Sequence, residues 1–125
     1  VSELGSDIIL PGYINDERQL KYIYRNASLF LFPSYYESFG MPPLEAMACG
    51  TPVVATDRTA VPEICGDAAR IVDPDSPESI AEGVHDILSD DRYTNELVEK
   101  GHKRASQFTW ASAADKLCGI FDEIV

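Results

Sequence analysis

The sequence predicts an α/β fold, in which helices cover a parallel β-sheet. The first observation is that short apolar runs alternate along the chain with stretches of helical periodicity. The second is that one run, LFLF from Leu29 to Phe32, is apolar throughout, as in a parallel strand buried on both faces. The third is that the links between these elements are short, which is typical of consecutive strand–helix units of one sheet.

The first part of the chain is expected to hold a strand, a helix and the apolar strand just named. Ile8 to Leu10 is an apolar run that Pro11 and Gly12 end, so we predict a short strand there. The next apolar residues recur at helical spacing and predict a helix: Leu20, Ile23, Tyr24 and Ala27. The strand at Leu29–Phe32 then follows.

The middle of the chain is expected to continue this alternation. A helix is predicted at Pro42–Cys49, because proline is accommodated in the first helical turn, where its missing N–H would have no partner. A strand at Val53–Thr56 follows, then a helical turn at Thr59–Cys65 that Gly66 closes. Arg70–Val72 is the last short strand that we predict.

The final third of the chain is expected to be helical. One amphipathic stripe consists of Ile80, Val84, Ile87 and Leu88. A further helix, ending near Thr109, carries Leu97, Gly101, Ala105 and Phe108. The last helix carries Ala114, Leu117, Phe121 and Ile124. None of these segments holds a pattern that indicates chemistry.

Composition limits the classes of function. A chain of 125 residues with 45% apolar and 10% aromatic residues forms one globular domain with a core of its own. Its formal net charge of −11 argues against binding to nucleic acid or to an anionic membrane surface. No apolar stretch reaches the length of a membrane-spanning helix.

Cysteines and histidines give no sign of a metal site. Cys49, Cys65 and Cys118 are an odd number without C-x-x-C spacing, so we expect buried free thiols in a reducing cytoplasm. His85 and His102 have no partner at metal-ligand spacing, and we expect both at the surface.

One short string has two interpretations. Asp73-Pro74-Asp75 matches the D-x-D pattern of metal-dependent transferases of another fold. The same residues, followed by Ser76 and Pro77, also form a turn sequence that caps the next helix. We favour the turn.

The string ESFGMPPLE, from Glu37 to Glu45, carries the strongest functional signal. It joins a predicted strand to a predicted helix, and no residue directly before its prolines can act as a side-chain N-cap. We therefore expect the amides of Leu44 and Glu45 to be free for an anion such as a diphosphate. Gly40 would let the backbone approach that ligand closely.

The two glutamates could hold hydroxyl groups of a sugar. Glu37 lies in the loop, where its carboxylate can accept hydrogen bonds from sugar hydroxyls. Glu45 is expected in the first helical turn and could accept from a ribose. A glutamate in that turn would also stabilise the helix by about 0.3–1 kcal/mol with no ligand, which is the other explanation for Glu45.

Residues Pro33 to Thr56, PSYYESFGMPPLEAMACGTPVVAT, resemble the donor-binding signature of retaining GT-B glycosyltransferases of family 4. The resemblance continues through Val61–Val84 and the QFTW segment, Gln107–Trp110. It implies a three-layer Rossmann-like parallel sheet that forms part of the C-terminal half of a GT-B fold, with C-terminal helices. It also implies that residues 1–125 are a single domain that binds a nucleotide-sugar donor.

The resemblance assigns roles to the central string. It implies that Glu37 is the catalytic-site glutamate that contacts the donor sugar, and that Glu45 contacts the nucleotide ribose. The backbone amides of the intervening loop would hold sugar hydroxyls and the distal phosphate: Ser38, Phe39, Gly40 and Met41. Tyr13 lies on a loop that the family places near the nucleobase; it could contact the base or be a half-buried loop aromatic.

The resemblance also implies a longer enzyme. An N-terminal acceptor domain with a catalytic-site histidine, and an Arg/Lys pair that neutralises the donor diphosphate, have no counterpart in these residues. We read the chain as a fragment that is inactive alone. Without the acceptor domain, the apolar face of the last helix would pack locally or be exposed, so we expect self-association.

The expected activity is metal-independent, cofactor-free transfer of a mannose- or glucose-type hexose, from a donor such as GDP-mannose or UDP-glucose, to a glycan, lipid or small molecule. Such an enzyme would act in the cytoplasm, or at a membrane surface through other parts of the chain, in cell-envelope glycan synthesis. Two alternatives stay open: a non-catalytic nucleotide-sugar binding module, and a flavodoxin-like regulatory or scaffold domain.

Overall fold

A parallel sheet of three strands, in the order β1-β2-β3, forms the centre of the computed structural model. The structure describes residues 7–124. The strands are β1, Phe30–Phe32; β2, Val53–Thr56; and β3, Arg70–Val72. Phe30 pairs with Val53, and Val54 pairs with Arg70. β2 is therefore the central strand and is buried throughout, whereas β1 and β3 each have one neighbour in the sheet.

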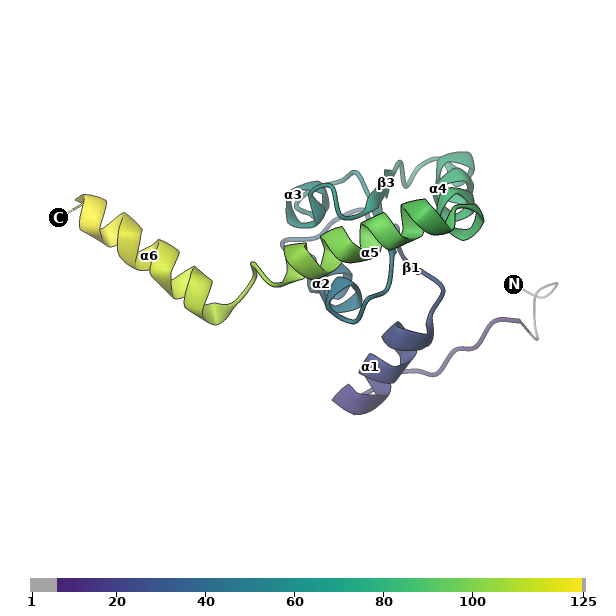
Figure 1. The fold of residues 1–125 in the computed structure, drawn as a ribbon, viewed down its shortest axis with the longest axis horizontal. Helices are drawn as coiled ribbons and strands as arrows, with labels where there is room; N and C mark the ends of the chain where they lie inside the picture. The colour runs from purple at the N-terminus through teal and green to yellow at the C-terminus, as the bar shows by residue number, and fades with distance from the viewer. Residues whose placement is uncertain (1–6, 125) are drawn as a thin grey trace.

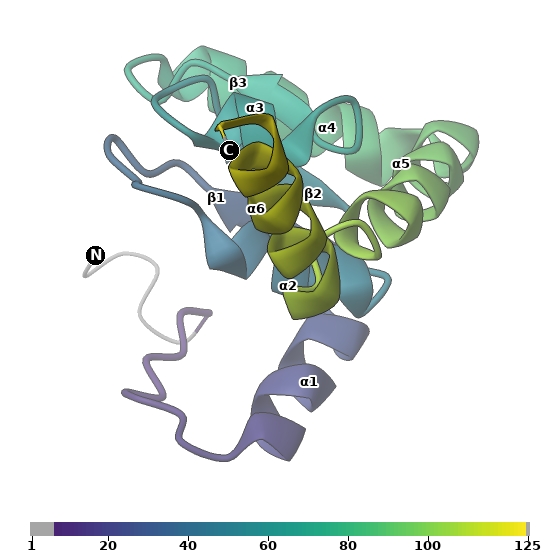
Figure 2. The ribbon, with the colours of Figure 1, turned by 90° about the vertical axis from the view of Figure 1, so that its left-hand side faces the viewer.

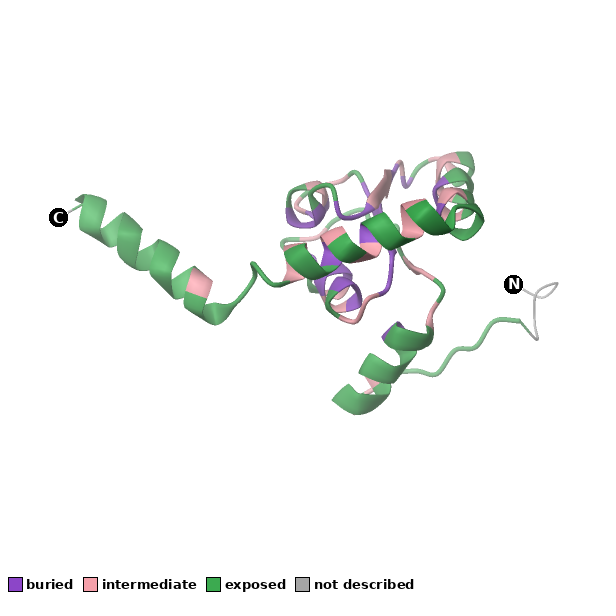
Figure 3. Ribbon diagram, in the orientation of Figure 1, coloured by how far each residue is buried: buried purple, intermediate pink, exposed green. Residues whose placement is uncertain are grey.

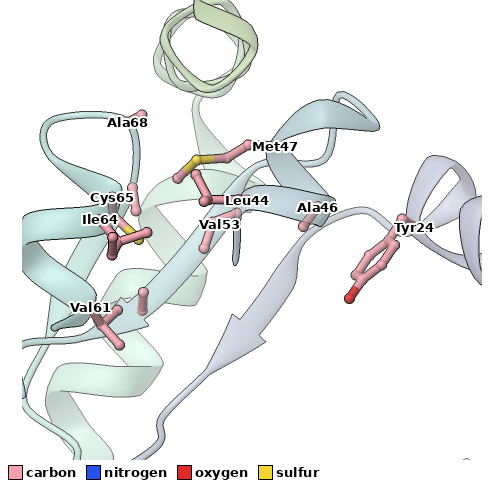
Figure 4. Close-up of a cluster of buried hydrophobic side chains, with 11 residues drawn as sticks. Tyr24, Leu44, Ala46, Met47, Val53, Val61, Ile64, Cys65 and Ala68 are labelled. Atoms are coloured by element: carbon pink, nitrogen blue, oxygen red, sulfur yellow. The ribbon is translucent and has the colours of Figure 1, made fainter. Parts of the chain in front are cut away.

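Helices cover both faces of this sheet. Alternate residues of β2 point to opposite faces. Val53 and Ala55 belong to one buried cluster, together with side chains of α2, Met41–Ala48, and α3, Val61–Cys65 (Figure 4). Val54 lies in a second cluster with Ile87 of α4, which spans Pro77–Ser89. Helix, sheet and helix thus form the three predicted layers (Figure 1).

Helix α5, Asp91–Ala105, joins the two layers of helices. It packs against α2 and α4, and Figure 1 shows it lying between them. Gly101 faces Met47: a Cβ at this glycine would lie 3.1 Å from the Met47 Cγ. Leu97, one turn earlier, belongs to the second cluster. A small residue at position 101 is what allows α5 to approach α2 closely.

Helix α1, Glu17–Asn26, lies next to α2 and is the outermost part of the N-terminal half (Figure 2). Asp16 caps it by accepting a hydrogen bond from the Arg18 amide at 2.8 Å. Tyr24 is its buried residue, and its ring meets Phe30 of β1 edge-on, with 5.3 Å between the ring centroids. α1 is therefore attached to the core through Tyr24, and the partly buried Leu20 packs against the same cluster.

Helix α6, Trp110–Ile124, extends away from the rest of the molecule (Figure 1). Figure 3 shows it as almost wholly exposed, and none of its described residues is buried. Its exposed large apolar side chains are Trp110, Leu117, Ile120, Phe121 and Ile124. Of the two predicted states of this face, local packing or exposure, the structure shows exposure, and self-association stays a prediction.

Most predicted elements are confirmed, and three predictions are wrong. The run Leu29–Phe32 is not buried on both faces, because β1 is an edge strand of the described sheet and Leu31 is 39% exposed. Ile8–Leu10 is not a strand: Ile9 and Leu10 are exposed, and the described sheet offers these residues no partner strand. A short apolar run becomes a strand only where a neighbour pairs with its backbone. Phe108 lies outside a helix, because α5 ends at Ala105.

The three cysteines are free thiols in different environments. Cys65 is buried, and burial raises the pKa of its thiol to about 11. Cys49 is partly buried, and Cys118 is exposed on α6. The prediction of buried thiols is therefore correct for Cys65 and wrong for Cys118, because no described residue of its helix is buried.

Candidate functional site

Three loops meet at one edge of the sheet. Residues 33–40, 57–60 and 73–76 directly follow β1, β2 and β3, respectively. Because the strands are parallel, their carboxyl ends lie at the same edge, where open α/β sheets bind ligands. The predicted sugar-contacting residue, Glu37, lies in the first of these loops.

Glu37 is held by two neighbouring residues. Its carboxylate oxygen Oε1 accepts a hydrogen bond from the Ser34 hydroxyl at 2.9 Å. Its backbone N–H donates to Thr59 Oγ1, in the loop after β2, at 3.0 Å. Within residues 7–124 the other carboxylate oxygen, Oε2, accepts no hydrogen bond, and the residue is half-buried. Glu37 is therefore fixed in position with one oxygen available to a ligand.

The loops after β2 and β3 are joined by ion pairs. Arg58 donates to Asp73 Oδ1 and to Asp75 Oδ2, both at 2.9 Å. The hydrogen bond from Arg58 to Asp75 is the main reason why the pKa of Arg58 is raised. The interaction of the Tyr35 hydroxyl with the Asp75 carboxylate is the main reason why the pKa of Tyr35 is raised. The Tyr35 hydroxyl also donates to the Pro74 carbonyl at 3.3 Å, which ties the third loop back to the first.

Asp73-Pro74-Asp75 forms a turn, as we favoured. Asp73 Oδ1 accepts from the Asp75 amide at 3.0 Å, and Ser76 then caps α4 by accepting from the Ser79 amide at 3.1 Å. No group of three or more side chains that could hold a metal ion occurs among the residues that the structure describes.

The N-terminus of α2 lies next to Glu37. The helix begins at Met41, one residue earlier than predicted, and Gly40 precedes it with φ 96° and ψ 57° and no side-chain cap. The next two residues are prolines without an N–H, so the amides with no acceptor inside the helix are those of Gly40 and Met41. The amides of Leu44 and Glu45 lie where helices bond internally. Their predicted freedom was therefore wrong.

Glu45 faces α1. As the fifth residue of α2 it lies outside the first turn, which contains no acidic residue, so the predicted stabilisation of that turn has no basis. Its Oε2 accepts a hydrogen bond from the Tyr24 hydroxyl at 3.2 Å. Burial, and then the charge of Glu45, raise the pKa of Tyr24 to about 12. Glu45 lines a cavity of about 160 Å³ with Glu17, Leu20, Lys21, Tyr24, Ala48 and Cys49.

The other predicted donor residues lie in different surroundings. Ser38 is exposed. Phe39 is partly exposed, and its ring meets Phe108 edge-on, with 5.9 Å between the centroids. The Leu44 side chain is buried in the core, so only its backbone could approach a ligand. Tyr13 is 89% exposed, so the alternative of a half-buried loop aromatic is wrong, and it does not line the cavity beside Glu45.

The chain matches the family described as glycosyl transferases group 1 over residues 2–104. It belongs to this family. The flavodoxin-like regulatory domain is therefore set aside.

Relatives of this group 1 glycosyl transferase support the same assignment. It is 42% identical, over 110 residues, to the O-antigen chain mannosyltransferase B of Escherichia coli, covering 88% of this chain and 29% of that protein. It superposes on the sucrose-phosphate synthase of Thermosynechococcus elongatus with a TM-score of 0.83 and 30% identity, covering 98% of this chain and 31% of that one. The chain thus spans less than a third of these relatives.

A solved C-terminal domain locates the match within the fold. The C-terminal domain of a glycosyl transferase group 1 family protein from Francisella tularensis matches with a TM-score of 0.72 and 32% identity, over 85% of this chain and 56% of that one. The prediction of a partial C-terminal GT-B domain is confirmed.

The candidate site includes residues that the sequence analysis did not indicate. Arg58 and Thr59 were missed, although a basic residue two positions after a strand's carboxyl end is a usable signal. A second, more open hollow of about 560 Å³ lies along α1 and contains none of the predicted residues. Among the described helices, none is both long and apolar enough to cross a membrane.

Proposed function

We propose that this chain is the donor-binding portion of a glycosyltransferase that moves a hexose from a nucleotide diphosphate sugar to a glycan, lipid or small-molecule acceptor. One observation carries the proposal: the half-buried carboxylate of Glu37 lies next to the uncapped N-terminus of α2, where the Gly40 and Met41 amides have no helical acceptor. A carboxylate for sugar hydroxyls beside free amides for a phosphate is the arrangement that a sugar diphosphate requires.

In this proposal each part of the donor meets a different group. The Oε2 of Glu37 would accept from a hydroxyl of the hexose and orient it. The amides of Gly40 and Met41, at the positive end of α2, would stabilise the charge that develops on the leaving diphosphate. Gly40 has a backbone conformation that other residues rarely adopt, and this conformation would bring these amides close to the phosphate.

The cavity between α1 and α2 is the proposed place of the nucleoside. Glu45 has one carboxylate oxygen bonded to Tyr24 and would offer the other to the ribose. Lys21 lines the same cavity, where it pairs with Glu17 at 2.7 Å, so its positive charge would serve the nucleotide only by leaving that pair. We keep Tyr13 as a candidate base contact, which would require its exposed segment to close over the nucleotide.

Mannose is the hexose that we favour, since a relative 42% identical over 110 residues is named a mannosyltransferase. We further propose a retaining, metal-independent reaction in the cytoplasm, in the synthesis of a cell-envelope glycan. The acceptor domain and the cations for the diphosphate would come from the rest of a longer chain, since these residues span less than a third of that relative.

Ligand titration tests the proposal. Calorimetry of the full-length protein with GDP-mannose, UDP-glucose, GDP and UDP should give a dissociation constant in the micromolar to low millimolar range for at least one donor. The variant Glu45→Gln should weaken it, whereas Glu82→Gln, at an exposed position on α4, should not. Absence of heat with every donor at millimolar concentration would refute the donor site.

The alternative is a nucleotide-sugar binding module without catalysis. Turnover by the full-length protein distinguishes the two. Release of nucleoside diphosphate from a bound donor, with transfer to an acceptor, supports the enzyme. Binding with no release over hours supports the module.

A further inference from the structure

Thr59 has a backbone conformation that is unusual for its side chain. Its φ is +52°, and it is the only non-glycine residue with a positive φ among residues 7–124. A β-branched residue is disfavoured in this left-handed region, because its side chain crowds the backbone. Such a conformation persists only where the surrounding contacts impose it, and it occurs often at functional sites.

The Thr59 side chain is hydrogen-bonded to the loop that carries Glu37. Its Oγ1 accepts the hydrogen bond from the Glu37 N–H at 3.0 Å. A glycine would adopt the same φ without crowding, but it would leave this amide without its acceptor. The backbone conformation at position 59 would favour glycine. The presence of threonine is therefore explained by its hydroxyl group and not by the backbone.

The loop that carries Thr59 is itself anchored. Its neighbour Arg58 pairs with Asp73 and Asp75 in the loop after β3. That loop is joined to the Glu37 loop through Tyr35 and the Pro74 carbonyl. Each of the three loops is thus bonded to the other two, so that the Thr59 hydroxyl is a fixed point and not a mobile side chain.

We propose that Thr59 is a positioning residue for Glu37. By fixing the Glu37 N–H, Thr59 sets the direction of the Glu37 side chain, while Ser34 holds one carboxylate oxygen. The remaining oxygen is then aimed at the hexose before the donor arrives, which lowers the cost of orienting it in the transition state. The inference rests on the proposed role of Glu37 in sugar transfer.

Three substitutions in the full-length enzyme separate the hydroxyl from the backbone conformation. Thr59→Gly removes the acceptor and the crowding, Thr59→Val removes the acceptor alone, and Thr59→Ser keeps the acceptor. We expect Thr59→Gly and Thr59→Val to lower kcat by about fivefold to tenfold, the effect of one hydrogen bond, with little change in the donor KM. Thr59→Ser should stay within about twofold of wild type.

Stability separates positioning from a structural role. Thr59→Gly relieves the crowding, so its thermal midpoint should be no more than about 2 °C below that of wild type, although its kcat falls. Wild-type kcat in Thr59→Gly would overturn the proposal, as would a loss of kcat in Thr59→Ser equal to that in Thr59→Val.

Two further measurements distinguish a failure of this inference from a failure of the proposed function. The first, amide hydrogen exchange, does not depend on activity. The exchange rate of the Glu37 amide hydrogen should rise by about fivefold in Thr59→Gly and Thr59→Val and not in Thr59→Ser. Unchanged exchange in all three would mean that the bond is absent in solution, which overturns the inference. If Glu37→Gln leaves kcat unchanged, the role of Glu37 fails; if it lowers kcat while Thr59→Gly does not, only the inference fails.

Discussion

The two glutamates of the string ESFGMPPLE have opposite surroundings. Glu37 lies on a loop and is held by hydrogen bonds from Ser34 and to Thr59, at the edge of the sheet. Glu45 lies on α2, a helix whose other side forms the core, and its carboxylate is bonded to the hydroxyl of the buried Tyr24. The difference teaches that the proposed donor site would combine two kinds of element: a largely exposed loop and a helix whose side chains form the core.

This comparison predicts that changes in the loop impair transfer, whereas changes in the helix impair folding. The loop between Pro33 and Gly40 is mainly exposed or half-buried, so its side chains contribute little buried area. In α2, by contrast, Pro43, Leu44, Ala46 and Met47 are buried.

The largest expected effect is at Met47. The substitution Met47→Ala should lower the free energy of unfolding by about 2–5 kcal/mol, because this 1%-exposed side chain fills the space between α2 and α5. Met41→Ala, at the 53%-exposed start of the same helix, is the matched control and should change stability by less than about 0.5 kcal/mol. Urea denaturation measures both. Equal losses of unfolding free energy in Met47→Ala and Met41→Ala would contradict the proposed difference between the buried face of α2 and its exposed start.

Next in size is the effect of Glu37→Gln on turnover. In the full-length protein we expect kcat to fall about a hundredfold, or about 2.7 kcal/mol in the barrier, because an uncharged amide cannot replace the carboxylate that orients the sugar. The unfolding free energy should change by less than about 0.5 kcal/mol. A loss of stability as large as the loss of transition-state binding would instead make Glu37 a structural residue.

A smaller effect is expected at Tyr24. The substitution Tyr24→Phe removes the donor to Glu45 and should weaken nucleotide binding by about fivefold, the effect of one hydrogen bond. Tyr22→Phe, on the exposed side of the same helix, serves as the control and should bind as wild type. Calorimetry with GDP or UDP measures both. Unchanged nucleotide affinity in Tyr24→Phe would show that the hydrogen bond between Tyr24 and Glu45 plays no part in nucleotide binding.

The last expected effect is a pH dependence of stability at Tyr24. The pKa of Tyr24 is raised from 10.0 to about 12 in the folded chain, so its contribution to stability is complete below pH 10 and is lost as the pH rises towards 12. The decrease in unfolding free energy between pH 9 and pH 11 should therefore be larger in wild type than in Tyr24→Phe. Parallel pH curves for the two proteins would contradict the raised pKa.

Local signals predicted most of the fold. The strands at Val53–Thr56 and Arg70–Val72 have the predicted bounds, since continuous apolar runs between turn residues leave little choice. The start of α2 was misplaced by one residue, because the left-handed Gly40 and not proline marks the boundary. With α2 starting at Met41, the amides that lack a helical acceptor are those of Gly40 and Met41, whereas those of Leu44 and Glu45 lie where the helix bonds internally.

The contacts between loops could not be predicted from the sequence. Thr59 is 22 positions from Glu37 and Arg58 is 15 positions from Asp73, so these bonds depend on the register of adjacent strands. Periodicity describes which face a residue occupies but not which loop tips meet. The sequence also did not predict that Glu45 points towards α1, because this orientation depends on how the two helices pack.

The outer side of β1 has a consequence for handling this protein. Along that side no described strand pairs with the backbone of Phe30–Phe32, and Leu31 is 39% exposed. An unpaired row of N–H and C=O groups is a template on which another strand can add, including the same strand of a second molecule. Concentrated preparations limited to these residues should therefore be prone to edge-to-edge aggregation. A preparation in which a further strand pairs with β1 should stay dispersed.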